Sequence, residues 1–154
     1  MPLTVMSQIH FDQVDRRFGG QRQEHVGVSS AEIVDLLGSV CPLGIWRLEI
    51  ETGRMFWSED AFRIHNMDQC QSPVSLNQVL ACYHPEDAKL VEQLMETATT
   101  QKNSYRHVMR VQNGRGGFRL VASAGRYRAD NGGELIGYYH EFQDMVRSVV
   151  LAET

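Results

Sequence analysis

Alternating hydrophobic and polar residues predict two short strands at the start of the folded region. Trp46, Leu48 and Ile50 alternate with charged residues, which is typical of a strand with one buried face. The Thr-Gly pair at 52–53 predicts a turn, because glycine adopts the backbone conformations that a tight reversal needs. A second strand begins at residues 55–57. The pattern therefore predicts a β-hairpin, and we expect the tryptophan at its end, Trp57, to be buried.

Hydrophobic residues at helical spacing predict helices on both sides of this hairpin. Ser58 is a candidate N-cap, and Glu59 and Asp60 suit the positive end of a helix dipole. Before the hairpin, Ser29 lies three residues ahead of Glu32, which is the capping-box pattern. The helix predicted there carries a short apolar stripe: Ile33, Leu36, Leu37 and Val40.

Two more helix starts follow in the middle of the chain. Ser75 and Gln78 form a second capping-box pattern. The segment His-Pro-Glu-Asp at 84–87 predicts a longer helix, because proline suits the first helical position and the two acids suit the dipole. We expect His84 to serve this helix start. The longer helix has one apolar face: Val91, Leu94, Met95 and Ala98.

The last part of the chain predicts a three-stranded meander. Its strands are expected at Tyr105–Gln112, Phe118–Arg128 and Leu135–Gln143, with glycine-rich turns between them. Two strands, several helices and then three strands suit a five-stranded antiparallel sheet with its helices packed on one face. The fold class is therefore α+β.

Three passages together resemble a PAS domain, in the third of the common PAS sequence groupings: the hairpin GIWRLEIETGRMFWSEDAFRI, the HPED segment and the closing segment 137–143. The resemblance covers 44–143. It implies a cap helix and linker at 29–43, an N-terminal extension at 1–28, and the start of a C-terminal signalling helix or tail at 144–154. The closing residues, GYYHEFQ, depart from the family's G-x-x-Q-D-I-T ending, whose Asp-Ile-Thr hands the signal to an output helix.

Composition restricts the partners that this chain can have. Its 154 residues have the length of one domain, and a net charge of −4 argues against general nucleic-acid binding. No apolar run reaches the roughly 20 residues of a membrane span. Three cysteines without a CxxC pair fit a reducing compartment. We expect a cytoplasmic, bacterial protein, and arginines between 106 and 128 that decorate a solvated sheet face.

The resemblance implies a sensory or signalling module, with a small molecule, or nothing, held between sheet and helices. Such a cavity would be largely apolar with a few polar groups. For each candidate wall residue, plain core packing is the alternative. The candidates are Trp46, Leu48, Met55, Trp57, Phe62, Leu90, Leu94, Tyr105, Arg119, Tyr138 and His140.

Cofactor and enzyme functions are alternatives to this prediction. A flavin photoreceptor would need a cysteine in the family's flavin-binding motif, and Cys70 and Cys82 lack the flanking Asn, Arg and Gln of that motif. A haem protein would need an imidazole with a free nitrogen aimed at the cavity, for which His65 and His84 are candidates. No common catalytic motif is present. We expect no cofactor, no metal and no catalysis; a haem- or flavin-bearing sensor and a small α+β enzyme remain open.

The apolar stripe at 29–43 predicts a homodimer. A helix of about ten residues is marginal alone in water, so it needs a surface. That surface is either the outer face of its own sheet or the same helix of a second copy, which would give a two-fold contact. The predicted interface is Ile33, Leu36, Leu37 and Val40. An output domain or a signalling protein is the other expected partner.

Overall fold

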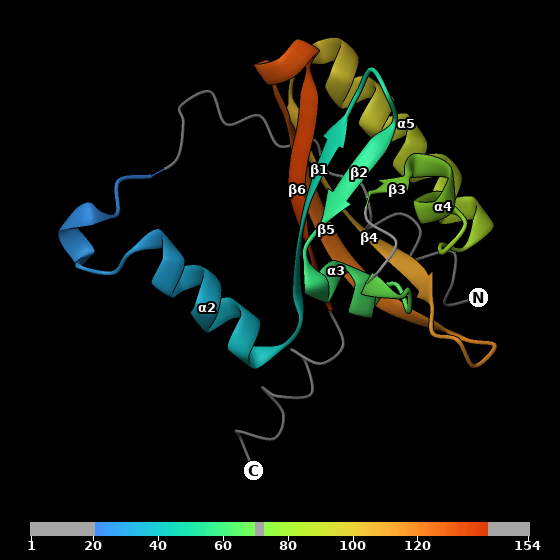
Figure 1. Cartoon of the computed structure of the whole chain (residues 1–154), viewed down its shortest axis with the longest axis horizontal. Helices are drawn as coiled ribbons and strands as arrows, with labels where there is room; N and C mark the ends of the chain where they lie inside the picture. The colour runs from blue at the N-terminus through green and yellow to red at the C-terminus, as the bar shows by residue number, and fades with distance from the viewer. Residues whose placement is uncertain (1–20, 70–72, 142–154) are drawn as a thin grey trace.

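The structure, a computed structural model, describes residues 21–69 and 73–141 (Figure 1). Cys70, most of the predicted N-terminal extension and the predicted segment 144–154 lie outside the described residues. In chain order the elements are η1 (Glu24–Val26), α2 (Ser30–Val40), β1 (Leu43–Glu49), β2 (Arg54–Trp57), α3 (Glu59–Ile64), β3 (Val74–Ser75), α4 (Leu76–Leu80), α5 (Pro85–Gln101), β4 (Ser104–Gln112), β5 (Phe118–Arg128), η3 (Asp130–Gly132) and β6 (Glu134–Glu141).

The described strands form one antiparallel sheet in the order β3-β2-β1-β6-β5-β4. The α+β prediction is confirmed, but the strand count is six instead of five. The additional strand, β3, has two residues, and it pairs Val74 with Met55 at the edge of the sheet. Two residues are too few to show an alternating pattern, so this strand could not be predicted from hydrophobic alternation. β1 and β6, from opposite ends of the domain, pair at the centre of the sheet.

Helices α3, α4 and α5 cover one face of the sheet, here called the inner face (Figure 1). The opposite face is called the outer face. α5 begins as predicted: Pro85 is its first residue, and the Glu86 N–H donates to His84 Nδ1 over 3.2 Å. The capping box of Ser75 and Gln78 is also present at the start of α4. These local signals place the helical layer over the sheet.

Ser58 is the N-cap residue of α3, as predicted, but its side chain makes no capping hydrogen bond to the helix. Its Oγ instead accepts a hydrogen bond from the Ile45 N–H, over 2.8 Å. Asp60 similarly accepts from the Leu43 N–H, over 3.0 Å. Both polar side chains therefore join α3 to the first residues of β1.

The core lies between the inner face and the helices. Side chains alternate along each strand, so Trp46 and Leu48 point inward while Ile45 and Arg47 point outward. Trp57 is 8% exposed, which confirms its predicted burial. α5 is tied to β4 by Asp87, whose buried carboxylate accepts from the backbone N–H and the guanidinium of Arg110 over 2.7–2.9 Å.

Helix α2 leads away from the sheet (Figure 1). Its capping box is formed as predicted: the Glu32 N–H donates to Ser29 Oγ, and the Ser29 N–H donates to Glu32 Oε1. None of its residues is buried. The chain becomes buried only at Cys41, whose Sγ lies 3.0 Å from His140 Nε2 at the end of β6.

Candidate functional site

A row of four residues crosses the middle of the sheet on its inner face. Trp46 on β1 is opposite Gly137 on β6, which is opposite Gly125 on β5, which is opposite Tyr105 on β4. The two glycines leave space between two large aromatic side chains. This row is where a ligand between sheet and helices would rest on the sheet.

Trp46 and Tyr105 occupy that space themselves. A Cβ atom on Gly137 would lie 2.5 Å from Trp46 Cζ2, and a Cβ on Gly125 would lie 2.7 Å from Tyr105 Oη and 2.9 Å from Trp46 Cη2. The indole therefore lies directly over the glycines, so close that any residue with a Cβ atom at position 125 or 137 would overlap with it. These two side chains also bring two polar atoms into the core. Trp46 Nε1 and Tyr105 Oη are both buried, and neither has a hydrogen-bond partner among the described residues.

A second buried cluster surrounds His65 at the end of α3. The imidazole stacks on Trp57 with 4.3 Å between ring centroids and meets Tyr139 edge-on at 4.7 Å. Its Nδ1–H donates to the Ala61 carbonyl over 2.7 Å, because a carbonyl can only accept, and the Tyr83 O–H donates to Nε2 over 3.0 Å. Burial lowers the pKa of His65 to about 4, so the ring is neutral at neutral pH.

These contacts determine whether the two candidate haem ligands, His65 and His84, have a ring nitrogen available for iron. Both ring nitrogens of His65 are engaged in hydrogen bonds, and iron would need one of them. His84 uses Nδ1 to cap α5. In the described parts of the chain, no group of three or more His, Cys, Asp or Glu side chains is arranged to hold a metal ion.

The structure separates the predicted ligand-binding residues into two groups. One group lies in or against the core between sheet and helices, and Tyr83, Tyr139 and His65 lie there too, although the sequence analysis did not select them for this site. The ligand-binding role of this group stays a prediction. Its members are Trp46, Leu48, Met55, Trp57, Phe62, Tyr105 and Leu94, with Leu90 partly buried on α5.

Arg119, Tyr138 and His140 lie elsewhere. Tyr138 is exposed on the outer face, and His140 contacts Cys41. Side chains alternate along β6, so the residue between them, Tyr139, is the one that points inward. The Arg119 guanidinium donates to the Ile64 carbonyl over 2.6 Å and pairs with Glu141, so it completes the end of α3 and does not face a cavity.

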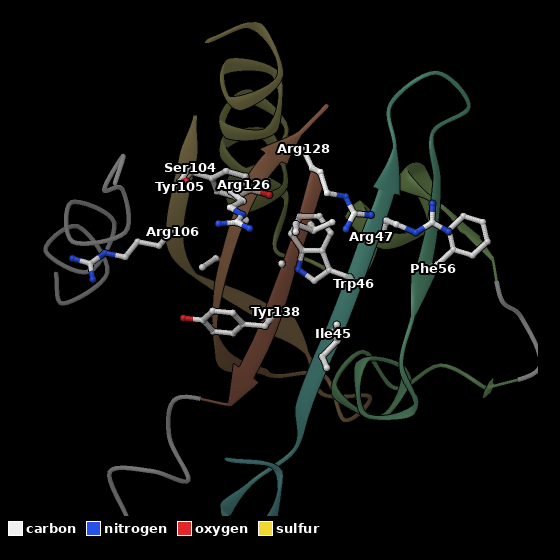
Figure 2. A pocket seen from close by; sticks show the side chains of 14 residues that line it. Ile45, Trp46, Arg47, Phe56, Ser104, Tyr105, Arg106, Arg126, Arg128 and Tyr138 are labelled. Atoms are coloured by element: carbon white, nitrogen blue, oxygen red, sulfur yellow. The ribbon is translucent and has the colours of Figure 1, made fainter. Parts of the chain in front are cut away.

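The outer face carries a groove of about 800 Å³ (Figure 2). Its floor is apolar: Ile45 on β1 and Tyr138 on β6 are directly opposite each other, and Ile136 follows on the same face. Sequence reasoning missed this groove, although Ile136 and Tyr138, two apart on one strand, were a sign of a second apolar face. The groove is lined by Ile45, Trp46, Arg47, Phe56, Ser104, Tyr105, Arg106, Ala124, Gly125, Arg126, Arg128, Ile136, Gly137 and Tyr138.

Arginines surround the groove, but they differ in their partners. Arg47 and Arg128 both hold the buried carboxylate of Glu134, with N–O distances of 2.6 and 2.8 Å, and these hydrogen bonds lower the pKa of Glu134, that of Arg128 contributing most. Arg47 also stacks on the Phe56 ring at 4.2 Å. Arg126 is exposed and forms no ion pair with any described residue. We expected these arginines to decorate a solvated sheet face. The face instead contains an apolar groove with arginines along one side.

The comparisons with known proteins agree with this geometry. The family model for the PAS fold matches residues 54–139, which is more than half of the chain. The chain belongs to the PAS fold family. It is therefore a PAS sensory domain. No curated protein sequence gives a match. None of the helices within 21–69 and 73–141 is long and apolar enough to cross a membrane.

Solved PAS structures are similar in fold. The N-terminal domain of a diguanylate cyclase with a PAS/PAC sensor from Marinobacter aquaeolei is 16% identical, with a TM-score of 0.57 over 64% of this chain and 94% of that one. A sensory box histidine kinase/response regulator from Burkholderia thailandensis is 20% identical, with a TM-score of 0.58 over 78% and 92%. An RNA-binding light-oxygen-voltage receptor is 15% identical, with a TM-score of 0.64 over 73% of this chain and 31% of that one. At these identities the likeness concerns the fold alone.

Proposed function

We propose that this PAS domain is a non-catalytic, cytoplasmic signalling module that acts by associating with a second copy of itself through helix α2, and so passes its state to an output domain or partner protein. The observation that carries this proposal is the helix itself. The four stripe residues are between 40 and 62% exposed, and no residue of the helix is buried: Ile33, Leu36, Leu37 and Val40.

The energetics favour a partner for this surface. Eleven residues form a helix that is marginal in water without tertiary packing. Full burial of one aliphatic side chain is worth roughly 1.5–3 kcal/mol, so four half-exposed side chains could contribute about 3–6 kcal/mol per helix. Part of this offsets the entropy lost on association. Two such helices in a symmetric dimer would contribute about 6–12 kcal/mol, which is of the same size as the roughly 4–15 kcal/mol that association costs.

The interior supports association over a haem- or flavin-bearing sensor. Trp46 lies over the two glycines, where a planar cofactor would need space, and His65 has both nitrogens engaged. A second candidate is a small polar molecule in the interior. It is favoured by Trp46 Nε1 and Tyr105 Oη, two buried donors without partners among the described residues. Mass spectrometry of compounds released on denaturation tests that candidate.

The test of association is sedimentation equilibrium on the whole chain. Wild type should be dimeric at a few tens of micromolar, and Leu37→Glu should be largely monomeric. Ala31→Glu is the matched control, because it adds the same charge to α2 on the side away from the stripe. It should leave the dimer intact. A monomeric wild type, or equal loss of dimer in both variants, would refute the proposal.

A further inference from the structure

We propose that the outer-face groove is a binding site for a small aromatic carboxylate, whose ring lies on the apolar floor and whose acid group meets Arg126. This site is separate from the interior between sheet and helices, and it does not depend on association through α2. The volume of the groove, about 800 Å³, falls within the roughly 300–1,000 Å³ that is usual for small-molecule sites.

The floor of the groove offers a place for a flat ring. Ala124 on β5 is opposite Tyr138 on β6, which is opposite Ile45 on β1. Ile45 is 47% and Tyr138 is 45% exposed. Because Ala124 carries only a methyl group, it does not fill the space beside the Tyr138 ring. A second aromatic ring can pack there against Tyr138 in an offset geometry.

The next row of outward residues supplies hydrogen-bond donors for an acid group. Ser104 on β4 is opposite Arg126 on β5, which is opposite Ile136 on β6. The Arg126 side chain is exposed. A guanidinium binds a planar carboxylate through two parallel hydrogen bonds, and the neighbouring Ser104 hydroxyl is a further donor. The apolar surface and the donors therefore adjoin each other within one groove.

The charges around the groove fit a ligand with one negative charge. Arg47 and Arg128 share the buried carboxylate of Glu134, with N–O distances of 2.6 and 2.8 Å, and Arg128 also pairs with Asp130 over 3.2 Å. Their positive charge is thus offset locally. Arg126 forms no ion pair within the described part of the chain. A carboxylate matches this one unpaired guanidinium, whereas a doubly charged phosphate would need a second.

The spacing of charge and floor determines the size of the ligand. Figure 2 shows Arg126 and Tyr138 at one end of the groove and Phe56 at the other. Strands lie about 4.8 Å apart, and successive outward residues on one strand lie about 6.7 Å apart. The backbone at Arg126 is therefore about 8 Å from Tyr138 and about 12 Å from Ile45. An aromatic ring joined to a carboxylate by a short linker spans the shorter of these distances.

A ligand in this groove exchanges readily with solvent. Ile45 and Tyr138 are nearly half exposed, so the groove does not enclose its occupant. A small molecule that buries only one of its faces binds weakly, and we expect a dissociation constant between roughly 0.1 and 1 mM. Such a molecule would be lost during purification.

Nuclear magnetic resonance on the whole, isotope-labelled chain tests the site, with cinnamate as the probe. Cinnamate should shift the backbone amide signals of Ile45, Arg126 and Ile136. Cinnamamide has the same ring without the charge, and acetate has the charge without the ring, so both should bind at least about fivefold more weakly. Absence of binding at 10 mM, roughly ten times the weakest expected dissociation constant, would overturn the inference. Shifts confined to His65 and Tyr139 would also overturn it, because they place the probe in the interior.

Two arginine variants test the role of the charge. Arg126→Gln should weaken cinnamate binding at least about fivefold, and the effect of wild-type Arg126 should diminish at high salt. Arg115→Gln is the matched control, because Arg115 is also exposed and without an ion pair among the described residues, but lies in the turn between β4 and β5. It should bind cinnamate as the wild type does. Unchanged binding in Arg126→Gln, or equal losses in both variants, would overturn the inference.

A variant of the floor tests the place of the ring. Ala124→Leu should fill the space beside Tyr138 and lower the affinity for cinnamate. Circular dichroism verifies that the variant is folded. Wild-type affinity in folded Ala124→Leu would contradict the proposed position of the ring.

Sedimentation equilibrium distinguishes this inference from the proposed function. Saturating cinnamate should leave the dimer intact, because no residue of α2 lines the groove. Dissociation of the dimer by cinnamate would show that the groove is a contact between copies, and would overturn the inference. A wild type that binds cinnamate as a monomer would refute the proposed function and support the inference.

Discussion

The glycine at position 137 allows a sharp test of how the interior is filled. A Cβ atom there would overlap most closely with the Ala124 carbonyl oxygen of the neighbouring strand, and it would also lie 2.5 Å from Trp46 Cζ2 and 2.7 Å from Cε2. Ordinary contacts of a Cβ atom are 3.4–4 Å. Trp46 is 2% exposed, so the ring cannot turn outward into solvent without leaving the core. Gly137→Ala therefore forces either the indole or the strand to shift.

We expect Gly137→Ala to destabilise the domain by about 3 kcal/mol, the upper end of the usual cost of overpacking. With a urea slope of about 1.5–2 kcal/mol per molar, the midpoint of unfolding should fall by about 1.5–2 M. Circular dichroism is the suitable probe, because tryptophan fluorescence would report on the perturbed ring itself. The matched control is Gly38→Ala in α2, where a Cβ meets nothing within 4 Å. It should change the midpoint little, and upward, because alanine favours helix.

A double-mutant cycle measures how much of the lost stability comes from the contact with the Trp46 ring. Trp46→Phe shortens the ring system over Gly137, so the double variant Trp46→Phe/Gly137→Ala should be more stable than the sum of the single effects predicts, by about 1 kcal/mol or more. Additive effects, or a Gly137→Ala midpoint close to that of wild type, would refute the account of Trp46 as the side chain that fills the sheet's centre.

Two further predictions concern buried polar groups. His65 has a pKa of about 4 when folded and an ordinary value of 6.5, so the unfolded chain binds the extra proton. Its contribution of about 3 kcal/mol is complete above pH 6.5 and is lost as pH falls to about 4; in His65→Phe the urea midpoint should depend less on pH over that window. Asp87→Ala should cost about 2–3 kcal/mol by thermal unfolding, because it leaves Arg110 without its buried partner. The exposed Glu86→Ala should cost under about 0.5 kcal/mol, and equal losses would contradict this ranking.

Local patterns predicted much of this fold. The capping boxes of α2 and α4 and the Pro85 start of α5 were correct, because each depends on residues close in sequence. Ser58 is the N-cap residue of α3, but its hydroxyl accepts a hydrogen bond from the distant Ile45 N–H and makes none to the helix. Signals of this kind depend on tertiary contacts that one segment cannot reveal.

The site was harder to predict than the fold. Along β6 the residues Ile136, Tyr138 and Tyr139 are all apolar or aromatic, so alternation did not indicate which face is inward. The groove depends on β1 lying beside β6, a pairing between opposite ends of the domain. The role of Gly125 and Gly137 likewise appears only when they face each other across two strands. Each of these features depends on strand order, which the sequence pattern alone left undetermined.

Native mass spectrometry of the whole chain as purified tests the central claim most directly, because it reports stoichiometry and bound compounds together. The account predicts a dimer at twice the 17.5 kDa chain mass, with no haem, flavin or other organic molecule attached. A monomer that carries the added mass of a cofactor or small molecule would contradict it.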